Sequence, residues 1–322
     1  MWLSYLYIFV GFIVLIWGAD RFIHGASGIA RNFGVSPLLV GLLIVGFGTS
    51  APEIIVSTIA SLQGKPGLAI GNALGSNIAN IGLVLGITAM LVPLVVQSST
   101  LSRELPLLLA VSLGAMALMM DGELSRLDGV ILSVGLVFTL TWLFLLSRKG
   151  HRKDPIQVEF ESEYADVLPM TGALFWFFAG LILLVGSSQL LVHGAVTIAT
   201  HLGVSELVIG LTIIAVGTSL PELAASIMSA LKNEPDIAIG NVIGSNIYNL
   251  LAVMAIPGMV APGHFSADVL NRDFPMMIGL TVAMFIMGYG IGGRGRINRL
   301  EGFVLFLAFC GYQYILYASI VA

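Results

Sequence analysis

Long apolar stretches, separated by short polar breaks, follow one another along nearly the whole chain. A membrane-spanning helix needs about 20 mostly apolar residues, and ten stretches of this kind can be placed. They cover residues 4–30, 38–62, 67–95, 104–120, 127–147, 171–199, 207–231, 237–261, 274–292 and 300–320. No positive charge precedes the first stretch and no small-residue cleavage site ends it, which favours a span over a signal peptide. The pattern predicts an all-α integral membrane protein with ten transmembrane helices.

The two halves of the chain are repeats of one another. Residues 41–82 and 210–251 align without a gap after a shift of 169 residues, and 20 of these 42 positions are identical. Each half holds five predicted spans, so the second half must enter the membrane from the opposite side. Inverted repeats of this kind, with discontinuous central helices, form transporters that bind their substrate near the bilayer midplane. We expect a first five-helix repeat over 1–147, a cytoplasmic linker over 148–169 and a second five-helix repeat over 170–322.

Composition supports the membrane assignment and narrows the function. The 322 residues are 57% hydrophobic and only 10% charged, whereas soluble domains carry about a quarter charged residues. A soluble enzyme, a disordered chain and a nucleic-acid binder are excluded. Cys310 is the single cysteine, so neither a disulfide framework nor a cysteine metal cluster can form. The 38 glycines and 12 prolines are too many for simple, unbroken spanning helices.

Positive charges predict the orientation in the membrane. With the N-terminus outside, the outer loops hold only Lys65, Arg126 and Arg272. The inner loops then hold ten basic residues: Arg31, Arg103, Arg148, Lys149, Arg152, Lys153, Lys232, Arg294, Arg296 and Arg299. Because cytoplasmic loops carry the excess of Lys and Arg, we expect a protein of the cell (inner) membrane with both termini on the non-cytoplasmic side.

Two matched polar motifs interrupt the second and seventh spans. Thr49-Ser50-Ala51-Pro52-Glu53 corresponds to Thr218-Ser219-Leu220-Pro221-Glu222. A carboxylate at the bilayer centre costs about 2.5–3.5 kcal/mol on insertion scales, and no Lys or Arg lies in these spans or in the third and eighth. Each proline frees the carbonyl four residues earlier, so hydroxyls, carbonyls and Glu together offer the oxygen ligands that hard cations such as Ca²⁺ prefer. A proline kink that only shapes packing is the alternative, and the duplication of the whole motif favours the cation site.

A second matched motif lies in the third and eighth spans, where Gly71-Asn72 and Gly240-Asn241 begin two related segments. Ser76 and Asn80 are four residues apart, as are Ser245 and Asn249, so each pair projects from one helix face. Their neutral oxygens could complete a cation shell, or they could serve as hydrogen bonds between helices. The glycines of the motif favour close helix packing.

At these motifs the chain resembles the sodium/calcium exchanger family of the cation/calcium antiporter superfamily, and its short prokaryotic members in particular. The resemblance covers all ten predicted spans. It implies a secondary transporter without a cofactor, whose transported ions are Ca²⁺ and Na⁺ and whose other surroundings are the lipid bilayer. It assigns the carboxylates of Glu53 and Glu222 to the ion site. Hydroxyl or carbonyl oxygens would come from Thr49, Ser50, Thr218, Ser219, Gly46 and Ala215, and the other side would be lined by Ser76, Asn80, Ser245 and Asn249.

Two sequence differences from related exchangers argue against K⁺-dependent exchange and against Ca²⁺/H⁺ exchange. In some relatives, including potassium-dependent exchangers, Asp occupies the position of Asn249. The Asn in this chain therefore argues against K⁺ co-transport. Calcium/proton exchangers place an acid shortly after Gly-Asn, where this chain has apolar residues and glycine. A passive cation channel and an intramembrane protease, suggested by Gly25-Ala26-Ser27-Gly28, are the remaining alternatives. Protein partners are not predicted.

The first and the last predicted span carry polar or aromatic residues outside the repeated motifs. Asp20 aligns with Gln189 and so breaks the repeat symmetry, and we expect it to pair with Arg21 or to extend towards the interface. Cys310 and the tyrosines that follow it, Tyr312, Tyr314 and Tyr317, are expected to face lipid or the membrane interface.

Overall fold

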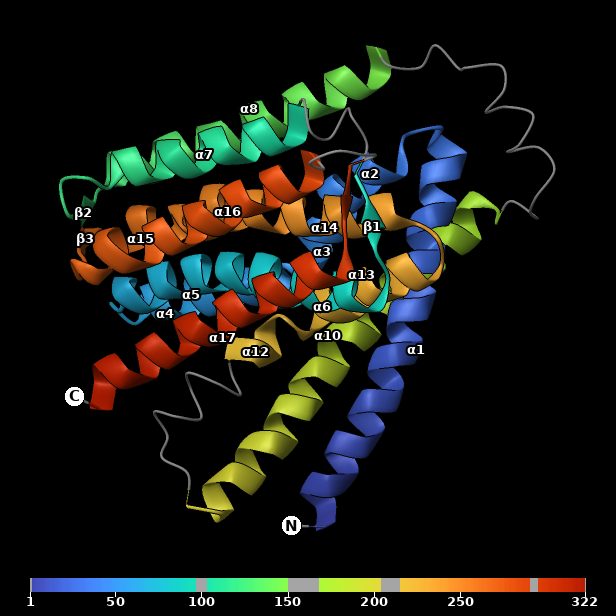
Figure 1. Ribbon diagram of the computed structural model, residues 1–322, viewed down its shortest axis with the longest axis horizontal. Coiled ribbons are helices and arrows are strands. Elements are labelled where there is room, and N and C mark those ends of the chain that lie inside the picture. Colours follow the sequence, from blue (N-terminus) through green and yellow to red (C-terminus); the bar gives the residue numbers. More distant parts are fainter. Residues whose placement is uncertain (1, 97–102, 150–167, 204–214, 290–294, 322) are drawn as a thin grey trace.

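The computed structural model describes residues 2–96, 103–149, 168–203, 215–289 and 295–321, and these are almost entirely helical (Figure 1). The first half contains α1 (Trp2–Phe33), α2 (Pro37–Val40), the π-helical turn η1 (Gly41–Val45), α3 (Gly46–Thr49), α4 (Ala51–Leu62), α5 (Pro66–Ala79), η2 (Asn80–Leu85), α6 (Gly86–Leu91), α7 (Leu105–Leu118) and α8 (Arg126–Lys149). The second half contains α10 (Met170–His201), α12 (Ala215–Thr218), α13 (Leu220–Leu231), α14 (Pro235–Tyr248), η5 (Asn249–Val253), α15 (Ala255–Val260), η6 (Val269–Asp273), α16 (Phe274–Tyr289) and α17 (Arg299–Val321).

The helical membrane character predicted from the sequence is confirmed. Within the described residues, seven helices are long and apolar enough to cross a membrane, and α2 to α4 add an eighth if this bent pair is one span. The two other predicted spans contain the shorter apolar helices Leu105–Leu118 and Leu220–Leu231. Most of the predicted linker, and the first part of the predicted seventh span, lie outside the described residues. The arrangement as ten spans in two repeats therefore stays a prediction.

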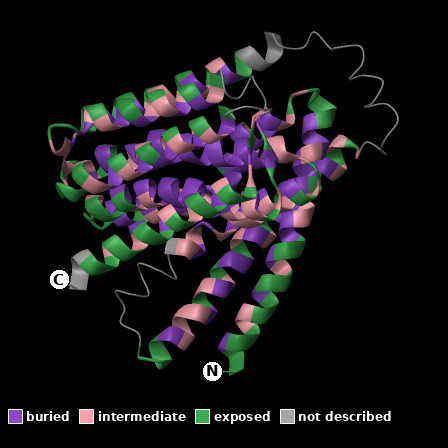
Figure 2. Cartoon of the chain, in the orientation of Figure 1, coloured by how far each residue is buried: buried purple, intermediate pink, exposed green. Residues whose placement is uncertain are grey.

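The most buried helices are those that carry the polar motifs. In the most apolar stretch of Pro235–Val260, 94% of residues are buried, and in Pro66–Leu91 78% are, against 22% in Arg299–Ala318. Figure 2 shows the same contrast between a buried centre and exposed outer helices. Outer helices expose large apolar side chains such as Phe138 and Ile182, as expected for a surface that faces lipid chains. The motifs are thus held in the interior of the bundle.

The same residue shift that relates the sequence repeats also relates their helices. Helix α4 begins at Ala51 and its counterpart α13 at Leu220. Helix α5 starts at Pro66 and ends at Ala79, whereas α14 starts at Pro235 and ends at Tyr248. Proline occupies the first or second position of all four helices, where its missing N–H breaks no helical hydrogen bond. Identical motifs therefore give identical helix boundaries.

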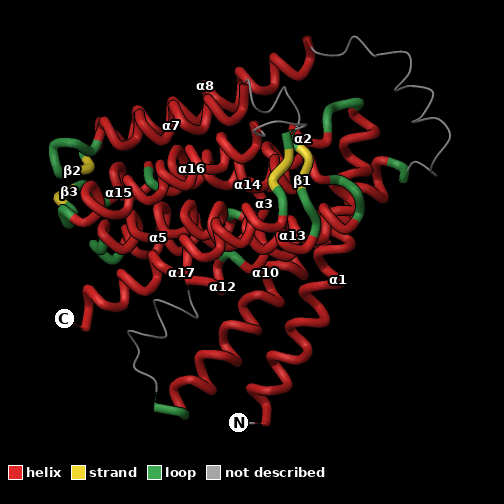
Figure 3. The backbone as a smooth tube through the Cα atoms, viewed as in Figure 1, coloured by secondary structure: helices red, strands yellow, loops and turns green. Residues whose placement is uncertain are grey.

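Short strands link the two halves at the ends of the bundle (Figure 3). Strand β1 (Leu94–Val95) pairs antiparallel with β4 (Arg296–Ile297), and β2 (Glu123–Leu124) pairs antiparallel with β3 (Gly263–His264). In both pairs one strand comes from each half of the chain. The β1 position in the first half corresponds to β3 in the second, so the pairings relate to one another as the repeats do.

Helices α1 and α10 lie side by side and extend away from the other helices (Figure 1). Glycines allow this close approach: a Cβ at Gly25 would lie 2.7 Å from the Ala173 carbonyl oxygen, and one at Gly18 would lie 2.9 Å from Leu183 Cβ. Small residues at a helix contact let two backbones pack tightly in a membrane. The many glycines of the sequence thus allow close helix packing in this pair, and they also do so at the centre of the bundle.

Candidate ion site

The two predicted glutamates lie at the centre of the bundle, each in the first turn of a helix that restarts after a break. Helix α4 is bent by 43° from the preceding helical segment, and Ser50, between α3 and α4, has non-helical angles of φ −80° and ψ 4°. Ser219 has nearly the same angles between α12 and α13. Glu53 and Glu222 are each 1% exposed. The prolines therefore produce the predicted breaks and place one buried carboxylate beyond each.

These carboxylates have few hydrogen-bond partners. Ser76 Oγ lies 3.5 Å from Glu53 Oε1, whereas Glu53 Oε2 and both carboxylate oxygens of Glu222 make no hydrogen bond within the described part of the chain. The Glu222 carboxylate interacts electrostatically with Glu53, and it lies near the side chains of Thr49 and Ser50 without reaching hydrogen-bond geometry with them. Burying an unpaired carboxylate is strongly unfavourable, and helices α4, α5, α13 and α14 contain no Lys or Arg. A positive charge is the partner that this pair of acids needs.

Neutral oxygens from the two halves of the chain lie close to one another where α3 meets α14. Ser245 Oγ donates to the carbonyl of Gly46 at 3.3 Å and lies 3.4 Å from Thr49 Oγ1. A Cβ at Gly46 would lie 2.9 Å from the Ser245 nitrogen, so glycine is what lets α3 approach α14 this closely. The Gly46 carbonyl also accepts from the Ser50 nitrogen at 3.1 Å. The predicted residues Gly46, Thr49 and Ser245 are thus brought together.

Three asparagines of the two repeats, Asn77, Asn80 and Asn246, are joined by hydrogen bonds where two helices change to π-helical turns. Turn η2 begins at Asn80 and η5 at Asn249. Asn80 Nδ2 donates to Asn246 Oδ1 at 3.1 Å, and Asn77 Nδ2 donates to the Asn246 carbonyl at 3.2 Å. Asn249 is fully buried, yet neither of its amide atoms has a hydrogen-bond partner among the described residues. π-turns are frequent at functional sites, and these two start at residues that the sequence predicts for the ion site.

The carbonyls freed by the two prolines have protein donors in this structure. The Gly217 carbonyl accepts a hydrogen bond of 2.7 Å from Ser188 Oγ on α10, and the Gly48 carbonyl accepts from the Ser50 nitrogen. Because each carbonyl oxygen has a second lone pair, their role as cation ligands stays a prediction. Ser219 is 1% exposed, and its hydroxyl has no hydrogen-bond partner within the described residues. Thr218 ends α12 and Ala215 begins it, and the side chain of Ala215 lies outside the description.

Two asparagines outside the predicted ligand set bind the backbone of the two glutamates. Asn72 Nδ2 donates to the Glu53 carbonyl at 3.1 Å, and Asn241 Nδ2 donates to the Glu222 carbonyl at 3.2 Å. Each asparagine follows the first glycine of its repeat motif. The signal for them in the sequence is that both repeats carry the asparagine at this position.

Two cavities lie beside the α1–α10 pair. One of about 350 Å³ lies between α10 and the first turns of α4 and is lined by Pro52, Ser188, His193 and Thr218, among others. The other, of about 240 Å³, is lined by His24, Arg31, Lys232 and Glu234, among others. The larger of these two is bordered by Thr218, a residue of the predicted ion site.

Ion pairs outside the site link α1 to the turn between α13 and α14. Asp20 lies 2.7 Å from Lys232 Nζ and 3.5 Å from Arg21 Nε. The expected Asp20–Arg21 pair is confirmed, and the shorter contact with Lys232 was not expected. Arg31 lies 3.6 Å from Glu234, and burial raises the pKa of the Glu234 carboxyl while Arg31 opposes that shift.

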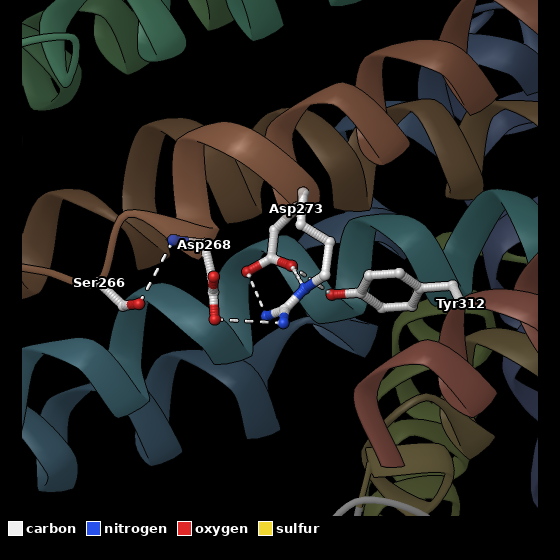
Figure 4. A network of polar contacts seen from close by, with 5 residues as sticks. Ser266, Asp268, Asp273 and Tyr312 are labelled. Carbon is white, nitrogen blue, oxygen red and sulfur yellow. Dashed lines mark hydrogen bonds and ion pairs between the residues drawn. The ribbon is translucent and has the colours of Figure 1, made fainter. Parts of the chain in front are cut away.

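A polar cluster at the start of α16 corrects one peripheral expectation (Figure 4). Tyr312 is 6% exposed, and its hydroxyl donates to Asp273 Oδ1 at 3.0 Å. The same carboxylate binds Arg272 Nε at 2.7 Å, and Arg272 Nη1 lies 3.3 Å from Asp268. The prediction that Tyr312 faces lipid or the interface is therefore wrong, because its hydroxyl has a buried partner. Cys310, Tyr314 and Tyr317 are exposed, as expected.

Comparison with known proteins identifies similar chains. The family model "Sodium/calcium exchanger protein" matches residues 3–145 and 172–318. CaxA of Alkalimonas amylolytica is 49% identical over 99% of this chain and 100% of its own length. A solved structure of the sodium-calcium exchanger NCX_Mj has a TM-score of 0.82 and 31% identity, and the match covers 96% of this chain and 97% of that one. The Ca(2+)/H(+) antiporter ChaA of Bacillus subtilis is 26% identical over 85% of this chain and 81% of its own length.

Proposed function

Because the chain belongs to the sodium/calcium exchanger family, we propose that it is a secondary active antiporter that exchanges Na⁺ for Ca²⁺ at one site. The observation that carries this proposal is the pair Glu53 and Glu222, two buried carboxylates from the two halves of the chain with no cationic side chain on their helices. Within the described residues, no group of three or more His, Cys, Asp or Glu side chains could hold a metal ion. Two acids surrounded by neutral oxygens suit a cation that must bind and leave, rather than a permanently held one.

Charge balance explains how one site couples two ions. Two carboxylates about 8 Å apart repel one another by roughly 2 kcal/mol at an effective dielectric constant of 20. Either one Ca²⁺ or two Na⁺ cancels their combined charge. Occupancy by one ion type then excludes the other. The two fluxes are coupled because the site changes the side to which it is open only when it is loaded with Ca²⁺ or with Na⁺.

The proposed ligands come from both repeats. Glu53 and Glu222 supply the charge, and the asparagines at the starts of η2 and η5 are proposed to add neutral oxygens. The full proposed set is Glu53, Glu222, Thr49, Ser50, Thr218, Ser219, Ser76, Asn80, Ser245, Asn249 and the carbonyls of Gly46 and Ala215. Buried acceptors without hydrogen-bond donors, such as Glu53 Oε2 and Asn80 Oδ1, support this assignment because such atoms need an electropositive partner.

Alternating access follows from the repeated architecture. The proposed organisation is a first repeat over 1–147, a cytoplasmic linker over 148–169 and an inverted second repeat over 170–322, with both termini on the non-cytoplasmic side of the cell membrane. Inverted repeats can exchange conformations and so open a midplane site to either side. The cavity beside Thr218 supports one of the two access paths.

Proton exchange is the competing coupling, since the chain is also similar to a Ca(2+)/H(+) antiporter. Two buried glutamates could be neutralised by protons as well as by Na⁺. The sequence argues against proton coupling, because the residues after Gly71-Asn72 and Gly240-Asn241 lack the acid expected in proton-coupled members. Na⁺ is therefore the coupling ion that we propose.

The test is Ca²⁺ uptake into proteoliposomes of the purified protein. With Na⁺ inside and none outside, we expect rapid uptake that stops when the Na⁺ gradient is abolished by equal Na⁺ on both sides. A pH gradient without Na⁺ should drive little uptake. Uptake driven by the pH gradient alone would replace Na⁺ by H⁺ in the proposal, and uptake that needs neither gradient would indicate a channel.

A further inference from the structure

Asn241 occupies the centre of the site without belonging to the proposed ligand set. It is fully buried on α14, one turn before Ser245. The preceding Gly240 packs so closely on α2 and η1 that a Cβ there would lie 2.9 Å from the Leu42 nitrogen. Helix α14 is therefore held against η1, and the Asn241 side chain lies between the broken helices of both repeats.

The contacts of Asn241 fix the orientation of its amide. Nδ2 donates to the Glu222 carbonyl at 3.2 Å and to Ser226 Oγ at 2.9 Å. A carbonyl only accepts hydrogen bonds, so the NH₂ group must face Glu222. Oδ1 then faces the opposite repeat, where Thr49 Oγ1 donates to it at 3.0 Å.

This orientation decides what Thr49 can offer to a cation. A hydroxyl has one hydrogen and two lone pairs, and it binds a cation only through a lone pair. Among the acceptors near the Thr49 hydroxyl, Asn241 Oδ1 at 3.0 Å lies closer than the Val45 carbonyl at 3.1 Å and the Gly46 carbonyl at 3.5 Å, and a hydroxyl that donates to Asn241 Oδ1 keeps its hydrogen off the ion. The lone pairs of Thr49 are thereby left for an ion, before any ion binds.

Asn72, the counterpart of Asn241 in the first repeat, is held by fewer hydrogen bonds. Asn72 is only partly buried, and Nδ2 donates to the Glu53 carbonyl at 3.1 Å. Ser57, the counterpart of Ser226, donates instead to the Val253 carbonyl at 2.9 Å. Ser226 therefore accepts a hydrogen bond from Asn241, whereas its counterpart Ser57 is bonded to Val253 instead.

We infer that Asn241 is a positioning residue of the ion site, which presents Thr49 as an acceptor and holds Glu222, and that the two halves of the site are unequally preorganised. This inference rests on the proposed function. It adds that Ca²⁺ affinity depends more on the Asn241 half than on the Asn72 half, although the two sequences are repeats. Preorganisation favours the ion with more ligands to assemble, so Ca²⁺ should depend on Asn241 more than Na⁺ does.

The test is equilibrium Ca²⁺ binding to purified variants, with melting temperature measured in parallel. Asn241→Ala should raise the Kd for Ca²⁺ about 10-fold or more, the loss that outer-shell partners of metal ligands commonly give. Asn72→Ala is the matched control and should raise it by a smaller factor. Ser226→Ala should weaken binding in the same direction as Asn241→Ala, and Ser57→Ala should affect it less.

A double-mutant cycle separates positioning from general destabilisation. If Asn241 acts partly through the Thr49 hydroxyl, Asn241→Ala must cost less Ca²⁺ affinity in a Thr49→Val background than in the wild type, and Thr49→Ser must restore the larger cost. Equal losses in both backgrounds, or a loss for Asn72→Ala as large as that for Asn241→Ala, would overturn the inference. If Asn241→Ala does not fold, Ser226→Ala against Ser57→Ala decides it alone. Absence of Ca²⁺ binding by the wild type would overturn the proposed function instead.

Discussion

Glu53→Gln and Glu222→Gln should each lower Ca²⁺ affinity by about 100-fold or more and abolish Na⁺-driven Ca²⁺ uptake. Glutamine keeps the size of the side chain and removes one of the two negative charges. At an effective dielectric constant of 20, a pair of unit charges about 4 Å apart interacts by about 4 kcal/mol, which exceeds the energy of a 100-fold change. The measurements are Ca²⁺ binding to the purified protein and uptake into proteoliposomes.

Glu123→Gln is the matched control for these two variants. Glu123 lies in β2 and pairs with His264, away from the broken helices. Glu123→Gln changes the net charge of the chain by the same amount as the other two variants. Because Glu123 lies away from the site, uptake and affinity should stay near the wild-type values. Full exchange by Glu53→Gln or Glu222→Gln would contradict the assignment of the site.

Gly244→Ala should destabilise the protein and damage the site together. A Cβ at Gly244 would collide with the backbone of Leu42, whose Cα would lie only 2.8 Å away. Backbone cannot move aside as a flexible side chain does, and overpacking of this kind costs about 1–3 kcal/mol. Separation of α14 from η1 and α3 would also draw Ser245 away from the Gly46 carbonyl. We expect a lower melting temperature and weaker Ca²⁺ binding.

Gly279→Ala supplies the matched control for the packing argument. Gly279 is exposed on α16, and a Cβ there meets nothing within 4 Å among the described residues. Replacing an unconstrained helical glycine with alanine is neutral or stabilising by up to about 1 kcal/mol. If Gly244→Ala melts no lower than Gly279→Ala, the close contact of α14 with η1 does not limit stability.

Most of the helices could be predicted from the sequence because apolar length and proline position determine them locally. Pro52, Pro66, Pro221 and Pro235 mark helix starts that the structure reproduces. The repeat also predicted that the two halves contribute matched residues. What could not be predicted is how the halves differ, since tertiary neighbours decide it: Tyr312 is buried because Asp273 lies opposite its hydroxyl.

The sequence predicts the residues of the candidate site, but it does not predict the hydrogen bonds that they make. Glu53, Glu222 and the Thr-Ser pairs stand out because polar residues are rare in spans. The fate of the freed Gly217 carbonyl depends on Ser188, which belongs to another helix and aligns with Ala19 in the first repeat. The π-turns at Asn80 and Asn249 likewise carry no signal in an apolar sequence that continues as a helix.

In the proposed mechanism Ca²⁺ and Na⁺ occupy one site between Glu53 and Glu222 in turn. Equilibrium Ca²⁺ binding to the purified protein at increasing Na⁺ concentration tests this shared occupancy. We expect competition: Na⁺ raises the apparent Kd for Ca²⁺ while the amount of Ca²⁺ bound at saturation stays unchanged. Ca²⁺ binding that Na⁺ leaves unaffected, or that Na⁺ reduces at saturation without changing the Kd, would contradict a shared site.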